Sequence, residues 1–217
     1  MWNKIIIKTP EQIEGIRRAS RLTHDVLDMI GTYVKAGVST EELDTIMNEF
    51  TIRNGGTSAC INYQWNNRWG KGGYPRFTCI SLNSVICHGI PRSDEILKDG
   101  DILNIDVTSI VDGYFGDASR MFSVGKISPN AQKVIRVSKR ALEIGMAEIR
   151  PGAHFWDIGF AINQYVTSEG CSVVRDYTGH GVGVNFHEDP AVFHRAEKGT
   201  GPEIRAGMIF TVEPMVN

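Results

Sequence analysis

The spacing of apolar residues along the chain predicts four helices. From Pro10 onward, apolar side chains recur every three or four residues, which is the period of an amphipathic helix. Ser39, followed by Glu41 and Glu42, supplies an N-cap and an acidic first turn, so a second helix is expected from there to the glycines at 55 and 56. The other two helices are expected at 128–149 and 155–168.

Between Thr78 and Val124 the pattern changes to alternation, which predicts strands. Asp112-Gly113 is a typical two-residue type I′ turn, and it sets Thr108 opposite Asp117 and Asp106 opposite Ser119. Asp106 and Asp117 are then diagonal neighbours on one face, with α-carbons roughly 7–8 Å apart. Their carboxylates could bind a common cation, or the face could be the wet side of an ordinary hairpin. A last strand is expected in "GMIFTVEPMV", 207–216.

Two pairs of segments resemble each other at nearly constant offsets. "VKAGVSTEELDTIMNEFTIRNGG" matches "IRPGAHFWDIGFAINQYVTSEGC", which sets Gly37 against Gly152 and Gly55 against Gly170. "KDGDILNIDV" matches "RAGMIFTVEP", which sets Asp106 against Glu213. We therefore expect one α/β (α+β) domain over 1–217, made of duplicated helix-helix-sheet halves at about 10–124 and 128–217 with a site shared between them. Coincidence over such short windows is the alternative.

Composition and charge narrow the class of protein. The 217 residues are 41% hydrophobic and 22% charged, enough to bury a sizeable core, and the net charge of −2 offers no basic field for nucleic acid or anionic membranes. The start of the sequence has no signal-peptide pattern and no apolar run reaches the roughly 18 residues of a membrane span, so a cytoplasmic protein is expected. The four cysteines contain no C-x-x-C pair and are expected to be reduced thiols.

Several further residues could carry chemistry. Glu213 lies in an apolar run that suggests a strand buried on both faces, where a carboxylate needs a metal or a paired arginine. "YTGHGVGVNFHEDP" places His180 and His187 among glycines, either as metal ligands or as turn residues. His88 in "ICHGIP" is a third candidate. Carboxylates combined with histidine favour Mn, Fe, Co or Zn in a mixed oxygen and nitrogen site. The other histidines, His24, His154 and His194, are interpreted as structural or surface residues.

Taken together, "ICHGIP", "KDGDILNIDVTSIVDGYFGDASRMF", "YTGHGVGVNFHEDP" and "IFTVEPMV" closely resemble the type I methionine aminopeptidases. The resemblance covers almost the whole chain. It implies the pita-bread fold and two divalent cations held by Asp106, Asp117, His180, Glu213 and one further glutamate. It also implies a pocket for the methionine side chain, formed by Cys60, Tyr63, Tyr74, Cys79 and Phe186. Asn83 and Val85 match a nearby monovalent-cation site of the family.

The implied activity is removal of the N-terminal methionine from nascent proteins and peptides, with preference for a small second residue. A metal-bound water has its pKa lowered towards 7, and the resulting hydroxide would attack the first peptide carbonyl. Glu213 would move the proton of this water, His187 would hydrogen-bond the carbonyl oxygen, and His88 the scissile nitrogen or the tetrahedral intermediate. The protein is expected to act as a monomer near the ribosome.

Two features depart from the family pattern. Gln64–Gly73 form a longer aromatic and basic insertion than usual, interpreted as a long surface loop, although it could reshape substrate entry. The sequence also ends at Asn217, before the last strands and the fifth ligand of the family. We therefore expect the chain as given to bind its second cation poorly and to be weakly active.

Two other functions remain possible on the sequence alone. An X-Pro aminopeptidase or prolidase would share the ligands, although Cys60 and Cys79 argue against it. A non-catalytic pita-bread protein would bind peptides or other partners without metal.

Overall fold

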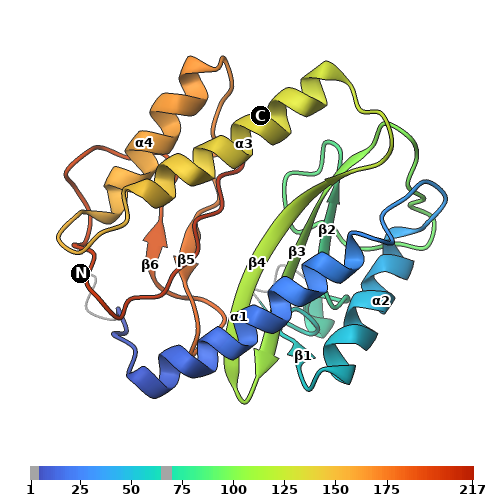
Figure 1. Cartoon of the computed structure of the whole chain (residues 1–217), viewed down its shortest axis with the longest axis horizontal. Coiled ribbons are helices and arrows are strands. Elements are labelled where there is room, and N and C mark those ends of the chain that lie inside the picture. The colour runs from blue at the N-terminus through green and yellow to red at the C-terminus, as the bar shows by residue number, and fades with distance from the viewer. Residues whose placement is uncertain (1–4, 65–69) are drawn as a thin grey trace. The chain divides into compact units, whose positions relative to one another are not determined.

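The computed structural model describes residues 5–64 and 70–217, so most of the expected insertion, residues 65–69, lies outside the described part of the chain. The chain forms two compact units (Figure 1). One unit contains residues 14–128. The other contains residues 129–217 together with the N-terminal residues up to Ile13.

The first unit is a four-stranded antiparallel sheet packed against helices (Figure 1). Strand β3 is central: β4 pairs along one side of it, and the shorter β1 and β2 pair along the other. The elements are α1 (Pro10–Ile30), α2 (Thr40–Arg53), β1 (Thr57–Ser58), a 3₁₀ turn η1 (Gly70–Gly72), β2 (Cys79–Leu82), β3 (Ile102–Val111) and β4 (Tyr114–Ser123).

The β3–β4 hairpin has the register that the sequence predicts. Val111 is paired with Tyr114, Thr108 with Asp117, and Asp106 with Ser119. The two turn residues have φ values of 51° at Asp112 and 79° at Gly113, as a type I′ turn requires. Because successive side chains on a strand alternate between faces, this register decides which residues share the polar face.

The alternation in β3 separates a buried apolar face from a polar face. Leu103, Ile105 and Val107 are buried under apolar residues of α1 and α2, including Val26 and Met47. Asn104, Asp106 and Thr108 point to the opposite face. The first unit thus uses its helices to bury one side of the sheet and presents its carboxylates on the other.

The second unit is built around two helices and a short ladder of strands. The apolar residues of both helices form one core with Val173, Val192 and Ile204, and Phe155 stacks edge-on against Phe210 at a centroid distance of 4.7 Å. The elements are α3 (Pro129–Ala147), α4 (Phe155–Ser168), β5 (Gly179–Gly181) and β6 (Glu188–Val192).

The internal repeat is visible in the backbone of the two units. Gly37 and Gly152 have φ values of 91° and 86°, and Gly100 and Gly207 have 96° and 91°. The N–H group of Gly37 donates to the carbonyl oxygen of Leu97, and the N–H group of Gly152 donates to that of Ile204. In both units the acceptor lies about 50–60 residues further along the chain. Matching left-handed turns at matching positions are what an internal repeat predicts.

The expected strand at 207–216 is not a regular strand, so this part of the prediction is wrong. Phe210 and Val216 form only isolated bridges, to Gly181 and Val173, and the residues from Met208 to Met215 are half-buried rather than buried on both faces. The ladder is interrupted because the Glu213 N–H donates to the ring of His194 and Pro214 has no N–H to donate.

No helix in the described part of the chain is both long enough and apolar enough to span a lipid bilayer.

Candidate metal centre

In the first unit, the polar face of the sheet brings together Asp106, Asp117 and Thr108. Asp106 lies between its strand partners Cys79 and Ser119, and Asp117 is the partner of Thr108. The Thr108 hydroxyl donates to Oδ1 of Asp117 at 3.0 Å. Such a bond orients a carboxylate while leaving lone pairs that can bind a cation.

In the second unit, His180 and Glu213 face each other. The Nε2 atom of His180 lies 3.7 Å from Oε1 of Glu213. The other ring nitrogen of His180, Nδ1, lies 2.9 Å from the carbonyl oxygen of Gly181, which assigns the N–H to Nδ1 and leaves the lone pair on Nε2. His180 therefore presents the tautomer that binds a metal, directed towards a carboxylate oxygen.

This pair fits a transition-metal cation. Nitrogen and oxygen ligands lie about 2.0–2.2 Å from zinc, so two ligands of one ion can be up to about 4.3 Å apart. The observed 3.7 Å falls within that span. Thr211 supports both candidate ligands, because its hydroxyl accepts from the backbone N–H of His180 at 3.0 Å and donates to Glu213 Oε1 at 2.6 Å.

His187 and Phe186 lie beside His180. The centroid of the His187 ring is 4.2 Å from that of His180 and 4.3 Å from that of Phe186. The structure thus places these three predicted site residues in one cluster of rings within the second unit.

The four residues predicted for the methionine pocket in the first unit also cluster. Cys60 and Cys79 are both buried, and hydrogen bonding between the two thiols, their burial and the nearby Asp106 and Asp117 raise the pKa of Cys60 well above its usual value. Burial and Cys60 raise the pKa of Tyr63. Cys60 and Tyr63 are therefore neutral at pH 7, as a pocket for an apolar side chain requires.

Tyr74 lies close to the same thiols, and its hydroxyl is fixed by the backbone. The hydroxyl lies 3.1 Å from the carbonyl oxygen of Thr78 and 2.7 Å from that of Gly89. Burial, followed by the influence of Cys79, raises the pKa of Tyr74 far above its usual value. Because Gly89 follows His88 directly, Tyr74 also anchors the segment that carries His88.

His88 has a left-handed backbone, with φ of 55°, and its Nδ1 lies 3.8 Å from the sulfur of Cys87. Left-handed backbone at a residue other than glycine is concentrated at functional sites. Asn83, the predicted monovalent-cation ligand, is also left-handed, and its Oδ1 accepts the Ile102 N–H at 3.1 Å. Val85 is 43% exposed.

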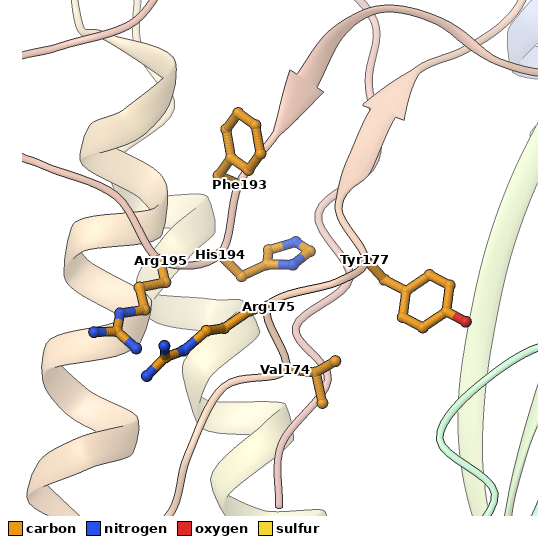
Figure 2. Close-up of a pocket in the computed structure, with 6 residues that line it drawn as sticks. All are labelled: Val174, Arg175, Tyr177, Phe193, His194 and Arg195. Atoms are coloured by element: carbon orange, nitrogen blue, oxygen red, sulfur yellow. The ribbon is translucent and has the colours of Figure 1, made fainter.

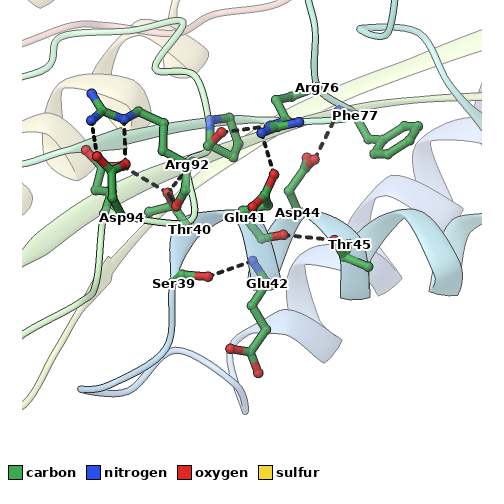
Figure 3. Close-up of polar contacts among 12 residues, drawn as sticks. Ser39, Thr40, Glu41, Glu42, Asp44, Thr45, Arg76, Phe77, Arg92 and Asp94 are labelled. Atoms are coloured by element: carbon green, nitrogen blue, oxygen red, sulfur yellow. Dashed lines mark hydrogen bonds and ion pairs between the residues drawn. The ribbon is translucent and has the colours of Figure 1, made fainter.

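Sequence reasoning missed the role of Asp44, which supports the start of β2. Its carboxylate accepts the N–H of Thr78 at 2.8 Å and the Thr78 hydroxyl at 2.7 Å. Figure 3 shows Asp44 beside the ion pair of Arg76 and Glu41. Burial raises the pKa of Asp44 despite these hydrogen bonds. Cys79 follows Thr78 directly, so this network holds a pocket residue in place. The sequence does not indicate that Asp44 is buried, because α2 also carries the acidic residues Glu41, Glu42 and Glu49.

His194 is the other unexpected residue. It is 2% exposed, and its Nε2 accepts the backbone N–H of Glu213 at 3.0 Å. Burial lowers the pKa of His194 to about 4, so the ring is neutral at pH 7. It lies at a pocket of about 230 Å³ that is also lined by Val174, Arg175, Tyr177, Phe193 and Arg195 (Figure 2). The burial of His194 could not be predicted, because charged residues follow it in the sequence and such segments are usually exposed.

The other two histidines have the structural or surface character expected of them. His24 is exposed on α1, with Nδ1 3.3 Å from the Asp28 carboxylate. His154 is the N-cap of α4, and its Nδ1 lies 2.9 Å from the carbonyl oxygen of Gly201. The four cysteines are free thiols.

Each unit, taken by itself, therefore holds two candidate ligands, one of which is hydrogen-bonded to a threonine hydroxyl. Within residues 5–64 and 70–217, no three His, Cys, Asp or Glu side chains are close enough together to form a complete cation site.

Comparison with known proteins shows the class to which this arrangement belongs. The model of metallopeptidase family M24 matches residues 14–217. A methionine aminopeptidase of Escherichia coli strain K12 is 48% identical over 214 residues, which cover 98% of this chain and 78% of that protein. The crystal structure of a methionine aminopeptidase from Rickettsia prowazekii superimposes with a TM-score of 0.92 at 42% identity, covering 98% of this chain and 82% of that one.

More distant structures share the fold alone. An Xaa-Pro dipeptidase from Bacillus anthracis superimposes with a TM-score of 0.80 at 23% identity, and the match covers 96% of this chain and 54% of that one. The family match and the fold thus define a metallopeptidase of the pita-bread type. The chain belongs to metallopeptidase family M24, and within that family it resembles the methionine aminopeptidases far more than the proline-specific enzymes.

Proposed function

We propose that this protein is a methionine aminopeptidase, which removes the N-terminal methionine from peptides and nascent proteins and prefers a small second residue. The observation that carries the proposal is the pair formed by His180 and Glu213, in which a metal-binding tautomer faces a carboxylate at 3.7 Å. The 48% identity to the Escherichia coli enzyme supports the same activity.

As a metallopeptidase, the protein depends on a divalent metal. The proposed ligands are Asp106, Asp117, His180 and Glu213, which offer the mixture of oxygen and nitrogen donors preferred by Co, Mn, Fe and Zn. Two ions of this kind are proposed, together with a monovalent cation near Asn83 and Val85. When bound, the divalent ions would lower the pKa of a water molecule and polarise the substrate carbonyl.

The protein side chains have separate tasks in this reaction. Glu213 is proposed as the general base, which accepts the proton of the attacking water and passes it on. A general base must lie within hydrogen-bond reach of the proton that it removes. His187 donates a hydrogen bond to the carbonyl oxygen as negative charge develops on it. His88 contacts the scissile nitrogen or the tetrahedral intermediate. Cys60, Tyr63, Tyr74, Cys79 and Phe186 are the residues proposed to contact the methionine side chain, and the neutral thiol of Cys60 suits its soft, apolar sulfur.

The proposed substrate suggests where in the cell the protein acts. Nascent chains expose their N-terminus close to the ribosome, and we propose that the protein acts there, in the cytoplasm, as a monomer.

A metal-dependent cleavage assay tests the proposed function. The apo protein is loaded with Mn, Fe, Co or Zn and supplied with Met-Ala-Ser, Met-Leu-Ser and Ala-Pro-Ser. Release of methionine from Met-Ala-Ser in preference to Met-Leu-Ser, abolished by a chelator and restored by metal, is expected. Cleavage of Ala-Pro-Ser alone would identify a proline-specific enzyme, and peptide binding without any cleavage would identify a non-catalytic protein.

A further inference from the structure

Lys8 and Glu188 form an ion pair that is almost completely withdrawn from solvent. Their side chains are 1% and 2% exposed, whereas Arg140 and Glu143 on α3 pair at 57% and 47% exposure. Two charges are costly to remove from water unless their remaining hydrogen-bonding capacity is also satisfied. A buried ion pair is therefore weak evidence that the pair stabilises the fold. Another structural role should explain why these two charges are buried.

The Glu188 carboxylate satisfies this requirement by closing a loop of its own chain. Its Oε2 binds the Lys8 ammonium, while its Oε1 accepts the backbone N–H groups of Val184 at 2.8 Å and Asn185 at 2.7 Å. One side chain at the end of the loop thus bonds two successive amides at its beginning. The conformation of the intervening residues is fixed by this closure.

The residues inside that loop are Phe186 and His187. Their rings stack at a centroid distance of 4.3 Å, and the His187 ring lies 4.2 Å from that of His180. Glu188 also begins β6, where it pairs with Gly181, the residue after His180. A shift of the Glu188 carboxylate would therefore move His187 relative to a candidate ligand.

Lys8 is held firmly enough to serve as a fixed point. Its backbone N–H donates to the carbonyl oxygen of Gly207 at 2.8 Å. The two segments approach so closely that a β-carbon at Gly207 would lie 2.8 Å from Cγ2 of Ile7. The ammonium is thus anchored through backbone contacts and not only through its flexible side chain.

We propose that Lys8 and Glu188 are positioning residues, which orient His187 and Phe186 towards the substrate. The proposal rests on the proposed function, because it assigns His187 to the substrate carbonyl and Phe186 to the methionine side chain. Lys8 fixes the carboxylate of Glu188, and Glu188 fixes the backbone from Val184 to His187. If the pair only stabilised the fold, its loss would not act specifically through His187.

Amide hydrogen exchange tests the effect on the loop without reference to activity. In Lys8→Met, exchange in the peptide spanning 183–188 is expected to be at least about tenfold faster relative to that of α4, since the carboxylate loses its fixed partner. The matched control is Arg140→Met, which removes an exposed pair of the same unit and should leave this peptide unchanged. Unchanged exchange in Lys8→Met would overturn the proposal.

A double-mutant cycle with His187→Ala tests whether the effect passes through His187. Lys8→Met is expected to lower kcat for Met-Ala-Ser about tenfold in the wild-type background, with metal content unchanged, and less than about twofold in the His187→Ala background. Equal factors in both backgrounds would overturn the positioning role.

A further variant covers the case in which Lys8→Met fails to fold because Glu188 remains charged. Lys8→Met/Glu188→Gln removes both charges and retains an amide oxygen for the two N–H groups. This variant should fold and still show faster exchange at 183–188 than the wild type, and unchanged exchange would count against the proposal. If the wild-type chain cleaves no methionine peptide, the proposed function fails, whereas the exchange measurements still decide whether the pair holds the loop.

Discussion

A threonine hydroxyl supports one carboxylate in each unit. Thr108 donates to Asp117 at 3.0 Å, and Thr211 donates to Glu213 at 2.6 Å. A donated hydrogen bond fixes the direction of a carboxylate and leaves its other oxygen lone pairs available to a cation. The two candidate ligands are therefore held in place before a metal binds, which reduces the conformational entropy lost on binding.

Removal of a proposed ligand should abolish metal-dependent turnover. In His180→Ala and Asp117→Asn, we expect kcat/KM for Met-Ala-Ser to fall by at least about 100-fold, together with the metal content measured by elemental analysis. Asp117→Asn retains an oxygen for the Thr108 hydroxyl, so its effect reports the charge and not the hydrogen bond.

His24→Ala is the matched control for these ligand variants. His24 is 63% exposed on α1, and its removal should change neither metal content nor turnover. Normal activity in Asp117→Asn would end the hypothesis that this carboxylate is a ligand.

The histidines proposed to stabilise charge should behave differently from the ligands. His88→Ala and His187→Ala are expected to keep their metal but to lower kcat by about 100-fold, because each removes a hydrogen bond that is strongest in the transition state. Kinetics and elemental analysis on the same samples separate the two roles. Loss of metal in both variants would show that these residues are ligands instead.

At the scale of elements, the sequence predicts most accurately those that are specified by local chemistry. Asp112-Gly113 fixes the turn, and the alternation then fixes every pair of the β3–β4 hairpin. Ser39 caps α2 as predicted, by accepting the Glu42 N–H at 3.1 Å. The irregular backbone of 207–216 could not be predicted in this way, because the Glu213 N–H donates to the ring of His194, a contact that no local sequence pattern indicates.

The contact between α1 and β4 depends on the absence of a side chain at Gly116. A β-carbon there would lie 2.2 Å from the backbone nitrogen of Ser20, so α1 would have to move away from the strand that carries Asp117. We expect Gly116→Ala to lower the free energy of unfolding by about 1–3 kcal/mol, measured by urea denaturation.

Gly72→Ala is the control for the substitution at Gly116, because no atom of residues 5–64 or 70–217 lies within 4 Å of its added β-carbon. Its effect should stay within about 0.5 kcal/mol. An effect of Gly116→Ala as small as that of Gly72→Ala would indicate that α1 and β4 accommodate the added methyl group without cost.

At the scale of the whole molecule, each unit offers a carboxylate as a candidate ligand at a corresponding position of the proposed internal repeat. Asp106 and Glu213 occupy corresponding positions, each six residues after a left-handed glycine, Gly100 or Gly207. That correspondence could be predicted from the sequence, because turns and core positions are repeated. The burial of Asp44, Glu188 and His194 could not, because it arises from contacts between segments that share no sequence pattern.

The buried carboxylate of Asp44 makes the stability of the molecule depend on pH. Asp44 is 1% exposed, and burial raises its pKa above the ordinary value of 3.8. The folded state therefore retains a proton that the unfolded state releases, so this group lowers the free energy of unfolding as the pH rises from about 3.8 through the native pKa. The slope cannot exceed about 1.4 kcal/mol per pH unit for one proton.

Comparison with Asp44→Asn isolates this effect from the surface carboxylates, among them Asp28 and Asp94. Their arginine partners lower their pKa values, so they act in the opposite direction. These groups are present in both proteins and cancel in the difference between them. We expect the free energy of unfolding of the wild type, relative to Asp44→Asn, to decrease as the pH is raised from 4 towards 7. Urea denaturation at each pH measures this difference. A difference that stays constant would mean that Asp44 has the same pKa folded and unfolded, and that its hydrogen bonds to Thr78 fully offset its burial.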